Sequence, residues 1–191
     1  MSRFSAELVR TAEEELAQYG RLLANQSPLK ERIDAYWRFL DPAGPPFHAW
    51  SAAFISYMAH LAGAGGTFRY SCRHSDYVHR AINARLAGEE NAPFVGFRTN
   101  ERPIELGDIV GMNRSDAPEI DYDWAAQQEV YKSHCDIVVS VGPDAITTIG
   151  GNVGGAPGTV GTKTWIRRDG VLLNAVKPAQ RVFVVIRATL P

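Results

Sequence analysis

Three residues in this sequence are of the types that together carry out acyl transfer: Ser51, His134 and Asn152. A serine hydroxyl attacks a carbonyl carbon when a histidine accepts its proton and a third polar group orients that histidine. Ser51 begins the segment SAAFISYMAHL, which we predict to be a buried helix. The unpaired N–H groups and the dipole of its first turn would favour negative charge beside Ser51. The alternative is purely structural, because serine is also a common N-cap residue.

The other two residues lie in segments typical of strands and turns. In SHCDIVVSV, strand alternation places His134 and Asp136 on one face and Cys135 on the other. Asn152 lies in TTIGGNVGG, where the flanking glycines let the backbone bend and bring a side chain close to another group. Asparagine is also frequent in turns, so these segments alone do not assign a function.

The elements that must position these residues fall into two halves. Apolar residues at spacings of three and four predict helices over 7–23, 29–39, 50–61 and 75–87. After residue 103, short β-branched runs predict strands over 108–112, 136–141, 145–149, 162–166 and 181–188. Helices followed by antiparallel strands indicate an α+β fold. We expect one domain over 1–191, with N-terminal helices in 1–40 and the site in 50–152, and with the main helix packed on a curled sheet of about five strands.

The composition excludes several classes of protein. Hydrophobic residues make up 45% of the 191 residues and charged residues 21%, which is typical of a soluble globular domain. The formal net charge is -1, so no basic excess favours a nucleic-acid partner. We predict no membrane span, because no apolar run is long enough. Three consecutive glutamates lie where a signal peptide needs an apolar core, so we expect synthesis in the cytoplasm without a leader. Cys72 and Cys135 lie outside any CxxC pair, and a bridge between them stays open.

The order of the segments WSAAF, PIELGDIVGM, SHCDIVV and TTIGGN resembles that in the papain-like CHAP and NlpC-type amidases and peptidases of bacterial cell walls. In that superfamily a Trp-Cys-x-x-Phe segment starts the main helix and Pro-x-x-Gly-Asp opens the first strand. A Gly/Ser-His segment opens the second strand, and a polar residue ends the third. The resemblance implies a papain-like fold with Ser51 as nucleophile, His134 as base and Asn152 as orienting group. A bacterial branch of the superfamily shares both WSAAF and the following His-Ser-Asp-Tyr segment, here residues 74–77.

The chain departs from this pattern at the nucleophile, where serine stands in place of cysteine. A thiolate–imidazolium pair forms readily, whereas a serine hydroxyl must lose its proton during attack. Serine triads place a carboxylate behind the histidine, and Asp136 or Asp76 would supply it, with His74 as a further supporting residue. The resemblance thus implies a hydrolase or acyl-transferase with a serine nucleophile that acts on amide bonds of peptidoglycan, without a cofactor or a resident metal ion.

Two other classes of function fit the same residues. The first is a catalytically silent domain that binds cell-wall fragments or a protein partner in a cleft lined by Trp50, Tyr70, His74 and Tyr77. The second is metal-assisted hydrolysis, because the triplets His74-Ser75-Asp76 and His134-Cys135-Asp136 contain side chains that suit zinc.

A peptidoglycan substrate would also imply a cellular setting. A wall-acting protein without a leader would be a bacterial effector that needs a dedicated secretion or phage route. An immunity protein covering the Ser51 cleft would then be its partner.

Overall fold

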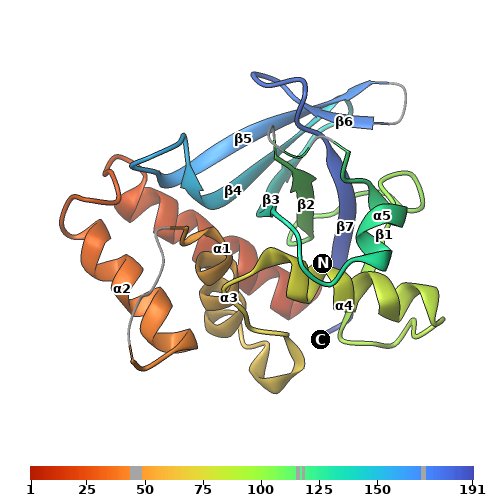
Figure 1. Ribbon diagram of the computed structural model, residues 1–191, viewed down its shortest axis with the longest axis horizontal. Coiled ribbons are helices and arrows are strands. Elements are labelled where there is room, and N and C mark those ends of the chain that lie inside the picture. The colour runs from red at the N-terminus through yellow and green to blue at the C-terminus, as the bar shows by residue number, and fades with distance from the viewer. Residues whose placement is uncertain (44–48, 115–116, 118, 169–170) are drawn as a thin grey trace.

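The computed structural model describes residues 1–43, 49–114, 117, 119–168 and 171–191 (Figure 1). Its longer helices come first, and they are α1 (Arg3–Tyr19), α2 (Leu29–Leu40), α3 (Ser51–Leu61) and α4 (His74–Leu86). The strands are β1 (Phe94–Phe97), β2 (Ile109–Asn113), β3 (Ser133–Val141), β4 (Ala145–Val153), β5 (Thr159–Arg168), β6 (Val171–Asn174) and β7 (Val182–Ala188). The connecting segments contain a short 3-10 helix (Gly65–Thr67) and α5 (Tyr122–Gln127).

The strands form one antiparallel sheet in the order β1-β7-β2-β3-β4-β5-β6. The predicted α+β class is confirmed, and the described sheet has seven strands where about five were expected. The two additional strands, β1 and β6, span four residues each and lie at the two ends of the sheet. Runs this short do not establish an alternating pattern in the sequence.

The two faces of the sheet have different roles. One face packs on α1, α3 and α4 and holds the main hydrophobic core, which includes Cys135 and Ile137 of β3 (Figure 1). The other face holds a smaller cluster that includes Val138 and Trp165. Alternate residues of β3 therefore enter different environments, as strand geometry requires. Helix α3 is buried on nearly all sides, which explains why its sequence is apolar around most of its circumference.

Arg32 of helix α2 contacts both α1 and α3. The Arg32 guanidinium forms an ion pair with the buried Glu15 carboxylate of α1 and lies 4.8 Å from the ring centroid of Tyr57 in α3. Burial raises the pKa of Glu15, and the hydrogen bond from Arg32 opposes that rise. These contacts fix α2 beside α3, where α2 forms one wall of the cavity described below.

A glycine in β4 allows α3 to approach the sheet. An added Cβ on Gly151 would lie 2.6 Å from Phe54 Cβ and 2.6 Å from Trp50 Cζ3. We therefore expect Gly151→Ala to displace α3 and to lower the free energy of unfolding by about 1–3 kcal/mol, as overpacking does elsewhere. Chemical denaturation measures this change. Gly66→Ala is the matched control, because nothing lies within 4 Å of its added Cβ; equal stability of the two variants would contradict the prediction.

Candidate functional site

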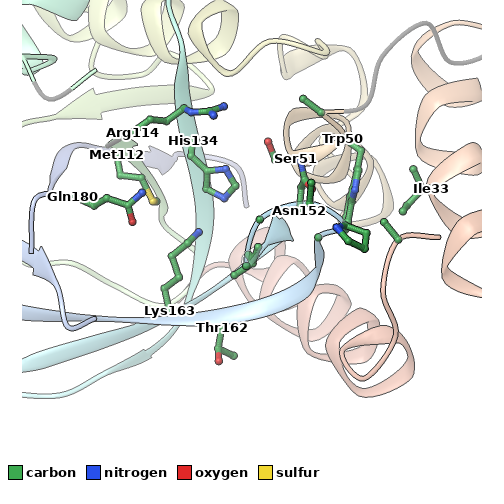
Figure 2. Close-up of a pocket in the computed structure, with 18 of the residues that line it drawn as sticks. Ile33, Trp50, Ser51, Met112, Arg114, His134, Asn152, Thr162, Lys163 and Gln180 are labelled. Atoms are coloured by element: carbon green, nitrogen blue, oxygen red, sulfur yellow. The ribbon is translucent and has the colours of Figure 1, made fainter. Parts of the chain in front are cut away.

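A cavity of about 1070 Å³ lies between α2, the start of α3 and the sheet. All three residues of the predicted triad, Ser51, His134 and Asn152, line it. Figure 2 shows Ser51 and Trp50 on the helix side of this cavity, and His134 and Lys163 on the side of the sheet. Segments separated by more than 80 residues in the sequence thus meet around one space.

Ser51 is the first residue of α3 and is nearly buried. The N-cap position belongs to Trp50, and no side chain caps the helix. The Ser51 hydroxyl instead forms a hydrogen bond with His74, with Oγ and Nε2 2.7 Å apart. The structural alternative for Ser51, an N-cap, is therefore not its role here. Among the described residues, no side chain caps the first backbone N–H groups of α3.

His74 begins α4 and is buried between Ser51 and Tyr77. Its Nδ1 atom forms a short hydrogen bond with the Tyr77 hydroxyl. When Nδ1 carries the ring proton and donates it to Tyr77, Nε2 is free to accept the proton of Ser51. Burial lowers the pKa of His74 well below its usual range, and the neighbouring His134 lowers it further. The imidazole is therefore neutral at physiological pH, which is the form that accepts a proton.

His134, on β3, belongs to a second series of polar contacts, separate from the Ser51–His74–Tyr77 series. Its Nε2 atom lies 2.9 Å from Asp136 Oδ1, so the two side chains share a face as strand alternation predicted. Asp136 is fully buried and also accepts hydrogen bonds from Lys163 Nζ (3.0 and 2.9 Å) and Thr148 Oγ1 (2.9 Å). Burial alone would raise the pKa of Asp136, but the charge of Lys163 and the contact with His134 outweigh it and lower that pKa. Asp136 is thus ionised.

The ionised carboxylate fixes the tautomer of His134. Because an ionised carboxylate only accepts hydrogen bonds, His134 must donate through Nε2–H, which leaves Nδ1 as the unprotonated nitrogen. Burial lowers the pKa of His134, and so does the charge of Lys163. The rings of His74 and His134 have centroids 5.3 Å apart. Two neutral histidines therefore lie side by side at the start of α3.

Asn152 occupies a strained turn at the end of β4. Its φ angle is 59°, in the left-handed region that non-glycine residues rarely adopt. Its Oδ1 atom lies against Gly158, where an added Cβ would come within 2.2 Å. Figure 2 shows Asn152 beside Trp50 and Ser51. The contact that orients His134 is made by Asp136, whereas Asn152 was predicted to make it.

The remaining predicted residues are distributed between the site and its surroundings. Trp50 lines the cavity, whereas Tyr77 is buried beneath His74. Tyr70 packs in an aromatic group with Phe39, 5.0 Å between ring centroids, and is not among the residues lining the cavity.

The second candidate carboxylate, Asp76, is engaged outside the cavity. It accepts a hydrogen bond from Ser71 Oγ at 2.7 Å and pairs with Arg73. Of the two predicted carboxylates, Asp136 is therefore the one that contacts a histidine of the site. Cys72 is exposed and Cys135 buried, and both are free thiols.

Across 1–43, 49–114, 117, 119–168 and 171–191, no three or more His, Cys, Asp or Glu side chains are grouped so as to hold a metal ion. No helix in the described part of the chain is long and apolar enough to cross a bilayer.

Comparison with known proteins places the site within a bacterial family. Residues 24–178 match the family described as "Uncharacterized protein conserved in bacteria (DUF2272)". The chain belongs to this family. Neither the curated proteins nor the solved structures gave a match. The matched span of DUF2272 contains both series of polar contacts, Ser51–His74–Tyr77 and His134–Asp136–Lys163.

In this DUF2272 protein, Lys163 and Thr148 also belong to the site, although neither was predicted from the sequence. Thr148 in β4 lies opposite Lys163 in β5, and both reach Asp136 of β3. The available signal was a lysine within a segment rich in β-branched residues, TVGTKTWI. That signal gains meaning only when the register of three strands is known.

Proposed function

We propose that this DUF2272 protein is a hydrolase or acyl-transferase that acts on amide bonds through an ester of Ser51. The observation that carries the proposal is the 2.7 Å contact between Ser51 Oγ and His74 Nε2, at an uncapped helix start in a large cavity. A hydroxyl bonded to a neutral imidazole is the arrangement from which serine nucleophiles act.

The geometry supports a defined first half-reaction. As Ser51 Oγ bonds to the carbonyl carbon, His74 Nε2 accepts its proton, and Tyr77 holds the opposite side of the ring. The backbone N–H groups of Ser51 and Ala52 at the start of α3 would stabilise the developing oxyanion. His74 then protonates the leaving amine as the C–N bond breaks. This assignment gives the role of base to His74, which directly contacts Ser51, where the cell-wall resemblance suggested His134.

For the substrate, we infer amide bonds of peptidoglycan, on the strength of the resemblance and of the cavity's charge. The charged residues that line the cavity are Lys30, Asp34, Arg114, Lys163 and Lys177. Lys163 is paired with Asp136, but Lys30 and Lys177 against Asp34 still leave a positive excess, which suits stem peptides because they carry free carboxylates. A papain-like fold is part of the same proposal, supported by a nucleophile-bearing helix packed on an antiparallel sheet. Delivery by a secretion or phage route and an immunity protein remain predictions that depend on this substrate.

The base assignment has a direct test with a fluorophosphonate, a probe that labels activated serines. We expect wild type to be labelled at Ser51 and His74→Gln to react at least about 100-fold more slowly, because glutamine cannot take up the proton. Intact-mass spectrometry and peptide mapping follow the label. His79→Gln, on the same helix but bonded to Asn83, is the matched control and should react like wild type. Equal labelling of His74→Gln would contradict the assignment, and an unlabelled, folded wild type would contradict the proposed function.

A further inference from the structure

The site holds one more basic nitrogen than the first half-reaction uses. His74 has both nitrogens engaged, Nε2 with Ser51 and Nδ1 with Tyr77. For His134, the described part of the chain shows a hydrogen bond at Nε2 alone, with Asp136, and the residue lines the cavity. Its unprotonated Nδ1 has no role in forming the ester.

We propose that His134 is a second catalytic base, which activates the acyl acceptor when the Ser51 ester is resolved. The inference rests on the proposed function and assigns the two half-reactions to different histidines. Once Ser51 carries an acyl group, the acceptor must approach from the cavity. His134 lies on the cavity wall, and its ring centroid is 5.3 Å from that of His74.

The hydrolytic step balances with water as the acceptor. The water oxygen bonds to the ester carbon while His134 Nδ1 takes one of the water protons. The C–Oγ bond of the tetrahedral intermediate then breaks, and Ser51 Oγ takes up the remaining hydroxyl proton of that intermediate. The product leaves as a carboxylate, and the His134 imidazolium releases its proton to solvent. No oxidant, reductant or other co-reactant is needed.

The surroundings of His134 support a role in proton transfer. The Asp136 carboxylate, 2.9 Å away, would stabilise the imidazolium that forms, as the buried aspartate of a serine triad does. Lys163 in turn holds Asp136 in its ionised form. Gly150 leaves space for this arrangement, because a Cβ there would lie 1.9 Å from Asp136 Oδ1. Asp136 and Lys163 are thus positioning residues.

The test follows acylation and deacylation separately, with p-nitrophenyl acetate as the acyl donor. We expect His134→Ala to release one equivalent of nitrophenolate in a burst and then to turn over about 100-fold more slowly than wild type, the scale of a lost general base. The acetyl-enzyme should accumulate and be visible by intact mass. His74→Gln should give no burst.

Added imidazole provides a second measurement that a structural role of His134 would not affect. We expect free imidazole to enter the cavity left by His134→Ala and to speed deacylation without changing the burst. Loss of the burst in folded His134→Ala would show that His134 activates Ser51 and would overturn the inference, as would unchanged deacylation. If neither wild type nor folded His134→Ala releases nitrophenolate or carries an acetyl group, the proposed function itself fails, and the inference with it.

Discussion

Ser51→Ala is expected to lower turnover of amide and ester substrates by at least about a thousandfold, the scale seen when a serine nucleophile is removed. The substitution deletes one oxygen atom and leaves the cavity wall in place, because the hydroxyl makes no capping contact in α3. Release of new termini from purified peptidoglycan, measured by mass spectrometry, gives the rate. Sedimentation with the same material measures binding and should be unchanged.

A second serine of the same helix provides the matched control. Ser56 is also buried in α3, but its hydroxyl bonds to the backbone of Ser71, outside the cavity. We expect Ser56→Ala to retain wild-type turnover per folded molecule. If Ser51→Ala keeps full activity, the ester mechanism is excluded. If wild type and Ser51→Ala bind the wall equally and neither turns over any substrate, the protein is a binding domain on this scaffold.

Asp136→Asn is expected to cause the largest loss of stability, about 3–5 kcal/mol, because it leaves the Lys163 ammonium charged and unpaired in a nearly buried place. Chemical denaturation at neutral pH measures the loss. The exposed Asp144, in the β3–β4 turn, is the control, and Asp144→Asn should change stability little. Adding Lys163→Met to Asp136→Asn should recover part of the loss, since it removes the unpaired charge.

The contacts of Asp136 also make the stability difference between wild type and Asp136→Asn depend on pH. The folded state lowers the pKa of Asp136, so its contribution is fully present above the unfolded pKa, about 3.9. This contribution to stability is lost as the pH falls from the unfolded pKa toward the lower pKa of Asp136 in the folded state. The stability gap between wild type and Asp136→Asn should therefore be constant near neutrality and shrink below about pH 4. A gap that stays constant under acid would show that Asp136 contributes by packing alone.

The local parts of the fold were predictable, and the long-range parts were not. The helix over 29–40 follows from its apolar spacing, and the shared face of His134 and Asp136 follows from strand alternation. The Ser51–His74 contact depends on how the starts of two helices pack together, which neither segment encodes alone. His74 was therefore named only as a supporting residue. Lys163 was missed for a similar reason, because its position depends on the β4–β5 register.

The short strands at the ends of the sheet have a consequence for how the protein behaves at high concentration. An exposed strand offers unpaired N–H and C=O groups to which another chain can add, and long flat edges promote such association. Here the two edge strands are only four residues long each, and Leu173 of β6 forms a bridge with Arg181 where the chain turns back toward β7. Each edge strand therefore offers only a few backbone N–H and C=O groups to which a strand of another molecule could add.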